Sequence, residues 1–120
     1  AKKNKKKFLK IWGNGKAKRE LMFVDDLSSA CEFFLKKKTN HYLINIGSGY
    51  ENTIKGYAKF IMKKLNVNLK IVYDKKKPNG TPRKKLDINL AKNYGWKSKI
   101  SFSQGFDFVF NDFKKNKNLK

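Results

Sequence analysis

The hydrophobic positions in the first third of the chain predict a strand, a second extended piece and a helix. The strand covers 8–12, and the extended piece covers 21–24 after a loop. Apolar residues then recur at helical spacing along one face: Leu27, Ala30, Cys31, Phe34 and Leu35. This spacing predicts an amphipathic helix that buries the face, including the thiol of Cys31. We expect Asp25 to be its N-cap and Asp26 to complement the helix dipole.

The middle of the chain predicts the order strand, turn, helix, strand. Tyr42–Ile46 is a short apolar run typical of a buried strand, and the turn Gly47–Gly49 follows it. A helix is predicted over 53–65, and an alternating, half-buried strand over 68–73. The turn invites comparison with a dinucleotide-binding loop. However, Asn52 replaces the third glycine, and no acidic residue ends a second strand about 20 residues on. A plain strand-to-helix turn is therefore favoured.

The last third of the chain predicts a turn and two helices. Pro78-Asn79-Gly80 is a strong turn signal, and a short helix over 87–94 ends at Gly95. Ser101 and Gln104 have the spacing of a capping box. An aromatic stripe that we expect in the core follows: Phe102, Phe106, Val109, Phe110 and Phe113. The whole pattern predicts an α/β subdomain that docks on a sheet outside it.

Charge suggests a nucleic-acid partner, but the type of basic residue argues against a specific one. The chain of 120 residues fits one small domain and has a formal net charge of +21. Only Arg19 and Arg83 are arginine, whereas direct base readout relies on arginine. Lysine and asparagine enriched together are typical of AT-rich codon usage. Solvated lysine surface is therefore favoured over specific nucleic-acid binding.

Candidate metal, disulfide and membrane features are weak. Cys31 is the single cysteine and His41 the single histidine, so the sequence predicts neither a disulfide nor a metal site. No apolar run approaches the roughly 20 residues that a membrane-spanning helix needs. No Ser–His–Asp set is recognisable, and we assign no catalytic residue.

Four motifs together carry a family resemblance. They are I-W-G-N-G-K-A-K-R-E-L-M-F-V-D-D at 11–26, N-I-G-S-G at 45–49, K-P-N-G-T-P-R-K at 77–84 and D-x-x-x-A-x-x-x-G-W at 87–96. In this order and spacing the chain resembles the GDP-L-fucose synthase branch of the extended short-chain dehydrogenases/reductases. The third motif is the most particular to that branch. The chain departs from it at Asn79, where the branch has Asp, and less sharply at Leu21 and Phe23.

The resemblance implies that residues 1–120 are the C-terminal substrate-binding portion of such an enzyme, without its N-terminal Rossmann half. Trp12, Arg19 and Asn79 fall on substrate-binding positions, with Lys77 and Arg83 as further candidates. The alternatives from the residues themselves are a core tryptophan and a solvated arginine. We expect Asn79 to keep, in weaker form, a hydrogen bond that Asp would accept.

The resemblance also implies the partners of the whole enzyme. NADP(H) would be bound by the missing N-terminal domain, which also carries the residues for hydride transfer and epimerisation. The substrate would be a GDP-sugar, converted from GDP-4-keto-6-deoxy-D-mannose to GDP-L-fucose in nucleotide-sugar biosynthesis. A cytoplasmic homodimer without membrane contact is implied, and the isolated chain is predicted to be inactive. Another nucleotide-sugar epimerase or reductase, or a basic nucleic-acid-binding module, remains the alternative.

Overall fold

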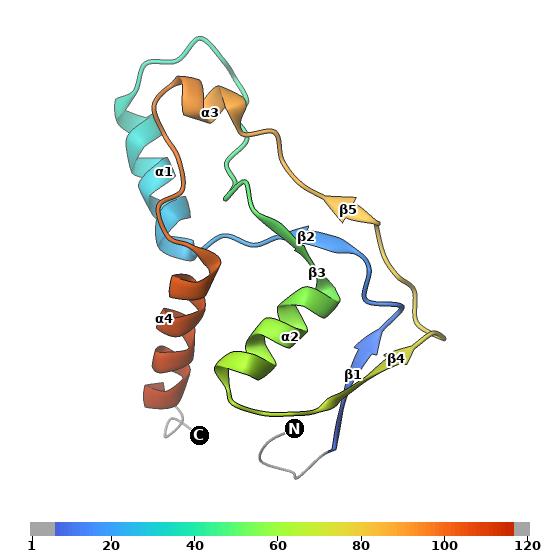
Figure 1. Cartoon of the computed structure of the whole chain (residues 1–120). Helices are drawn as coiled ribbons and strands as arrows, with labels where there is room; N and C mark the ends of the chain where they lie inside the picture. The colour runs from blue at the N-terminus through green and yellow to red at the C-terminus, as the bar shows by residue number, and fades with distance from the viewer. Residues whose placement is uncertain (1–6, 117–120) are drawn as a thin grey trace. The chain divides into compact units, whose positions relative to one another are not determined.

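The computed structural model describes residues 7–116 and divides into two compact units, where the length predicted one small domain (Figure 1). The first unit comprises the chain up to Arg19 together with Glu51–Lys84. The second comprises Glu20–Tyr50 and the chain from Lys85 onwards. Each unit is assembled from two stretches that lie far apart in the sequence. The chain contains both helices and strands, and the predicted α/β class is confirmed.

The first unit is built on two small sheets and one helix. Its elements are β1 (Phe8–Trp12), β2 (Lys18–Glu20, which ends at the unit boundary), β3 (Glu51–Thr53), α2 (Ile54–Lys64), β4 (Lys70–Asp74) and β5 (Arg83–Lys84). β1 and β4 pair in parallel, and their register places Trp12 opposite Asp74. The other sheet has the order β3-β2-β5, with β2 and β5 parallel. The strand at 8–12 is confirmed, whereas the loop predicted over 13–19 ends earlier, at β2.

Local capping and one buried tyrosine hold α2 against the strands. Thr53 is the N-cap, and its hydroxyl accepts a hydrogen bond from the Gly56 N–H at 2.9 Å. Tyr57 is buried, and its hydroxyl donates to the carbonyl of Arg19 at 2.9 Å. A buried tyrosine combines a large apolar ring with a satisfied polar end, so this contact fixes α2 beside β2.

The second unit packs three helices, α1 (Val24–Lys36), α3 (Asn89–Asn93) and α4 (Phe102–Lys115), without a strand of its own beyond Glu20 among the described residues. Ala30, Ala91 and Trp96 form its buried cluster. The Trp96 indole N–H donates to the Ser29 hydroxyl at 3.2 Å. The predicted capping box of Ser101 and Gln104 is confirmed at the start of α4.

Asp26 is a buried carboxylate that joins α1 to the segment before α4. Its side chain accepts hydrogen bonds from the Ser98 hydroxyl at 2.7 Å and from the N–H groups of Lys99 and Ile100, each at 3.0 Å. Burial acts to raise the pKa of Asp26, but these hydrogen bonds and the charge of Lys99 outweigh it and lower the pKa below its usual 3.8. Asp26 therefore has a larger structural role than the dipole effect predicted for it.

The start and the buried face of α1 differ from the prediction. The helix begins at Val24, so Asp25 lies inside its first turn, and the N-cap is Phe23 without a side-chain hydrogen bond. The short extended piece predicted over 21–24 is therefore misplaced: β2 ends at Glu20, residues 21–23 are neither strand nor helix, and Val24 is already helical. Ala30 is buried, but Leu27, Cys31 and Leu35 are exposed, so the predicted burial of the thiol is wrong. The core of this unit contacts the side of α1 that carries Asp26 and Ala30, not the whole apolar stripe.

Two further predictions of burial, over 42–46 and along the aromatic stripe of α4, are wrong for part of their residues. No strand forms over 42–46, and Tyr42 and Leu43 are exposed, because no strand of residues 7–116 pairs with this segment. In the aromatic stripe of α4, Val109 and Phe113 remain more than half exposed. Gly105 is the buried residue of that helix, where its missing Cβ allows close contact with the Phe23 ring. The lysine-rich lead-in over 1–6 and the end of the tail lie outside the described residues.

Candidate functional site

An exposed tryptophan marks the carboxyl end of the parallel strand pair. Trp12 is the last residue of β1, and its side chain is 67% exposed although indole is large and apolar. The Lys77 ammonium lies 5.4 Å from the centre of its ring, in the connection that follows β4. Carboxyl ends of parallel strands are the usual location of ligand sites in α/β proteins. The ring and the cation together could bind a flat group and an anion.

The turn after Trp12 is fixed to the connection between β4 and β5. Gly13 adopts φ +65° and is buried, and a Cβ there would collide with Asn79. The Asn14 N–H donates to Asn79 Oδ1 at 2.7 Å, and the Gly13 N–H donates to the Asp74 carbonyl at 2.9 Å. Only glycine tolerates both the backbone conformation and the contact, so the Gly-Asn-Gly sequence is explained by the neighbouring turn.

Arg19 contacts the same connection from β2. Its Nη1 donates to the carbonyls of Lys18 at 2.6 Å and Thr81 at 2.7 Å. A Cβ on Gly80 would lie 3.2 Å from Nη2, so the guanidinium is next to this glycine. The structure thus places Trp12, Asn79 and Arg19 along one continuous set of contacts. Guanidinium carries five N–H donors, so Nε and Nη2 retain the capacity to bind an anion.

Arg83, a further candidate, is engaged by a carboxylate that the sequence analysis did not single out. Arg83 Nε donates to Glu51 Oε2 at 2.8 Å, and its Nη2 lies 2.8 Å from Oε1. Glu51 also lies 3.7 Å from the Lys18 ammonium. The hydrogen bond and charge of Glu51 raise the pKa of Arg83. This two-pronged ion pair joins β3 to β5 across β2 and makes Arg83 less suited than Arg19 to a ligand.

Tyr73 and Lys77 have the four-residue spacing of the Tyr-x-x-x-Lys pair used in hydride chemistry, but not its geometry. Tyr73 lies within β4, where its ring packs close to Gly15. Lys77 follows the turn after the strand and lies over Trp12. Residues four apart share a face in a helix, and a strand followed by a turn does not give this arrangement. We therefore assign no catalytic role to Tyr73 or Lys77. That the chain holds no catalytic residue stays a prediction.

The Gly47–Gly49 turn surrounds a carboxylate of its own chain. The Gly49 N–H donates to Glu20 Oε1 at 2.6 Å, and the Leu86 N–H donates to Oε2 at 3.0 Å. A Cβ on Gly47 would collide with the same carboxylate. The donors and space that a dinucleotide phosphate would need are thus used by a negative group, and this turn does not fit that cofactor. Glu20 was missed because its partners lie 29 and 66 residues away.

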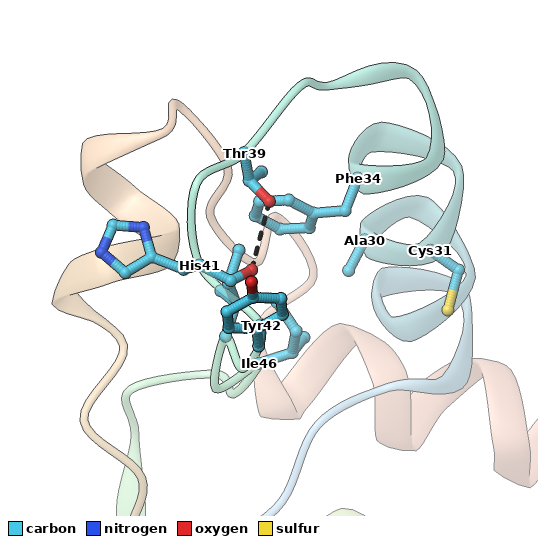
Figure 2. A pocket seen from close by; sticks show the side chains of 8 residues that line it. Ala30, Cys31, Phe34, Thr39, His41, Tyr42 and Ile46 are labelled. Carbon is cyan, nitrogen blue, oxygen red and sulfur yellow. Dashed lines mark hydrogen bonds between the residues drawn. The ribbon is translucent and has the colours of Figure 1, made fainter.

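A pocket of about 300 Å³ lies in the second unit, between α1 and the extended segment that follows it (Figure 2). Its lining is Ala30, Cys31, Phe34, Thr39, His41, Tyr42, Ile44 and Ile46. The His41 ring points away from the other side chains in Figure 2, and its Nδ1 lies 2.7 Å from the Tyr94 hydroxyl. The lining includes no Asp, Glu, Lys or Arg to fix a charged ligand, which makes this pocket the weaker candidate.

The described part of the chain has neither a metal-binding cluster nor a membrane-spanning helix. Residues 7–116 contain no group of three or more His, Cys, Asp or Glu side chains that could hold a metal ion. Within the same range, no helix combines the length and the apolar character required to cross a bilayer.

Comparisons with known proteins agree with the resemblance. Residues 1–47 match the NAD dependent epimerase/dehydratase family. A putative GDP-L-fucose synthase 2 of Arabidopsis thaliana is 36% identical over 116 residues, which is 97% of this chain and 35% of that protein. GDP-L-colitose synthase of Yersinia pseudotuberculosis is 37% identical over 114 residues, covering 92% of this chain and 36% of the relative.

Solved structures show the same relationship in three dimensions. The crystal structure of a GDP-6-OMe-4-keto-L-xylo-heptose reductase from Campylobacter jejuni superposes with a TM-score of 0.79 at 27% identity. The match covers 92% of this chain and 34% of that one. The chain thus spans about a third of the length of its relatives, and the matched part is their C-terminal part.

Proposed function

We propose that this chain, a relative of the GDP-L-fucose synthases within the NAD dependent epimerase/dehydratase family, is the sugar-nucleotide-binding part of a GDP-sugar epimerase and reductase. The observation that carries the proposal is the arrangement at the end of β1. An exposed indole, a lysine over its face and an arginine of β2 that contacts the adjoining connection all lie in one unit. A sugar nucleotide presents a flat base, a diphosphate and a polar sugar, which match these three groups.

Each group has a chemical role in this proposal. Trp12 packs on the substrate, because burying its exposed face against an apolar or flat surface is favourable. Arg19 binds the diphosphate through the fork of Nε and Nη2 while Nη1 stays on its two carbonyls. Lys77 adds positive charge beside the ring, and Asn79 holds the turn that follows Trp12.

The reaction of the whole enzyme is the conversion of GDP-4-keto-6-deoxy-D-mannose to GDP-L-fucose. It consists of epimerisation at C3 and C5, next to the C4 ketone, followed by reduction of that ketone. We assign none of these proton or hydride transfers to the described residues. In this proposal NADP(H) is bound by the N-terminal domain of the whole enzyme. The glycine turn of this chain encloses Glu20 and offers no phosphate site. A cytoplasmic homodimer that uses no nucleic acid is part of the same proposal.

A second candidate is a related GDP-sugar enzyme with another product. It is favoured by the relative named GDP-L-colitose synthase, which is 37% identical to this chain, against 36% for the putative GDP-L-fucose synthase 2 of Arabidopsis thaliana. Asn79 stands in the loop that is most particular to the fucose synthase branch, and it departs from that branch. Turnover of different GDP-keto-sugars by an enzyme containing this chain separates the two candidates.

The role of Arg19 can be tested by calorimetric titration of the chain with GDP. Arg19→Lys keeps the charge but removes the planar fork, so we expect GDP affinity to fall about tenfold, or ~1.4 kcal/mol. Arg83→Lys is the matched control, because it makes the same change at an arginine already paired with Glu51. We expect it to change GDP affinity less than threefold, roughly 0.7 kcal/mol. Equal losses in both variants, or no GDP binding by the wild-type chain, would contradict the proposal.

A further inference from the structure

Asn79 has its side-chain oxygen committed to the chain itself. Oδ1 accepts the Asn14 N–H at 2.7 Å across 65 residues of sequence, and Gly13 packs against the same residue. A backbone N–H can only donate, so the amide atom that faces it must be the oxygen. This contact therefore identifies which atom of the Asn79 amide is the oxygen and which is the nitrogen. The NH2 group is then the branch that remains for other partners, on a residue that is exposed.

The neighbours of Asn79 place this residue at the candidate site. Lys77, two residues earlier, lies over the Trp12 ring, and Gly80, the next residue, lies beside the Arg19 guanidinium. A ligand that bridged Trp12 and Arg19 would therefore lie along the connection that carries Asn79. Because the oxygen accepts the Asn14 N–H, the NH2 group is the part of the side chain that such a ligand could use.

We propose that Asn79 is a specificity-determining residue that fixes the Gly13–Gly15 turn with its oxygen and offers a donor to the ligand with its amide. This inference rests on the proposed function. It requires an acceptor on the ligand at this point, such as a phosphate oxygen or a sugar carbonyl. A carboxylate in the same place could hold the turn equally well, but it could only accept and would repel phosphate. The polarity of the contact is thus opposite to that of an Asp. This inference replaces the accepted hydrogen bond expected from the sequence, because the oxygen is used by the Asn14 N–H.

Two isosteric variants separate the donor from the charge. Asn79→Asp keeps an oxygen for the Asn14 N–H, removes the donor and adds one negative charge. Asn14→Asp is the matched control. It adds the same charge on the Gly13–Gly15 turn that Asn79 contacts, and its oxygen can still accept the Lys16 N–H, which Asn14 Oδ1 now accepts at 2.9 Å. Asn79→Ala removes both the oxygen and the donor.

Nitrogen–proton correlation spectra of the 120-residue chain, titrated with GDP, test both halves of the inference. We expect the Trp12 indole signal of the wild type to shift with GDP, and the Asn79 side-chain NH2 pair to shift with it. Asn79→Asp should bind GDP about three- to tenfold more weakly than Asn14→Asp, as loss of one hydrogen bond to an anion implies. The Asn14 amide should exchange with solvent faster in Asn79→Ala but not in Asn79→Asp.

The outcomes distinguish this inference from the proposed function. If Asn79→Asp binds GDP as tightly as Asn14→Asp, the donor role is wrong while the proposed function stands. If the Asn14 amide exchanges equally in Asn79→Ala and the wild type, the oxygen does not hold the turn. If GDP moves no signal of the wild-type chain, the proposed function fails and the donor role fails with it.

Discussion

Replacing Asp26 by Asn should destabilise the second unit strongly although the two side chains have the same shape. Asp26 has 3% of its surface exposed and accepts three hydrogen bonds, two on Oδ2 and one on Oδ1. Asn retains one oxygen. Its better orientation keeps that oxygen toward Ser98 and Ile100 and turns the NH2 group against the Lys99 N–H, so two donors face each other.

The magnitude follows from these contacts. A buried donor left without an acceptor costs about 1–3 kcal/mol. The two remaining hydrogen bonds lose their charged acceptor, which weakens each by roughly 0.5–1 kcal/mol. We therefore expect Asp26→Asn to lower the free energy of unfolding by about 2–5 kcal/mol. Asp25→Asn, at the neighbouring exposed position of the same helix turn, should change it by less than about 0.5 kcal/mol.

The assay is urea unfolding followed by tryptophan fluorescence. Trp12 belongs to the first unit and Trp96 to the second, so a Trp12→Phe background makes the emission report the second unit alone. Wild type, Asp26→Asn and Asp25→Asn are compared in that background. An Asp26→Asn chain within 0.5 kcal/mol of its parent, a limit typical of unimportant surface positions, would refute the reasoning.

The pH dependence gives an independent check of the same carboxylate. Its pKa is lowered in the folded chain from 3.8, so the proton binds more tightly to the unfolded chain. The ionised group therefore stabilises the fold above that value, and the contribution is lost as pH falls from 3.8 through the folded pKa. The difference between the parent and Asp26→Asn should stay constant from about pH 7 to about pH 5 and shrink below 3.8. A constant difference throughout would assign the destabilisation to something other than the ionised carboxylate.

Two further predictions concern the chain as a whole. The purified 120-residue chain should not oxidise NADPH with any keto-sugar nucleotide, and measurable turnover in an absorbance assay would show that it contains a catalytic centre. The chain should bind DNA weakly, without sequence preference and with a steep loss on adding salt, because its +21 charge acts through counterion release. A gel-shift series in which one sequence is preferred by about 10³ or more would show specific recognition instead.

Local signals in the sequence were sufficient where the structure depends on neighbours in the chain. The strand at 8–12, the helix capped by Thr53 and the Ser101–Gln104 capping box all follow from residues a few positions apart. Several apolar residues over 42–46 and along α1 that the pattern predicts to be buried are exposed: Leu27, Leu35, Tyr42 and Leu43. An apolar stripe indicates that a face favours burial, and it does not say whether the partner lies within the same 120 residues.

The candidate site was predictable only through motifs, and its internal contacts were not predictable at all. The resemblance selected Trp12, Arg19 and Asn79, and the structure brings their connections together. The pairing of Asn79 with Asn14 and of Arg83 with Glu51 spans 65 and 32 residues. Helical periodicity and capping motifs involve residues only a few positions apart, so they cannot predict pairs at such distances. The residues that stabilise the site through these pairs can be identified only from the structure.

The division of the chain into two discontinuous units limits how it can be truncated or exchanged. The path changes unit after Arg19, after Tyr50 and after Lys84, so each unit is assembled from two separated stretches. No single uninterrupted piece of the gene encodes either one. A deletion from either end removes part of one unit and leaves the remainder without its other half. Exchange with a related enzyme, in the laboratory or by recombination, therefore has to transfer both stretches of a unit together or accept a hybrid in which each half comes from a different parent.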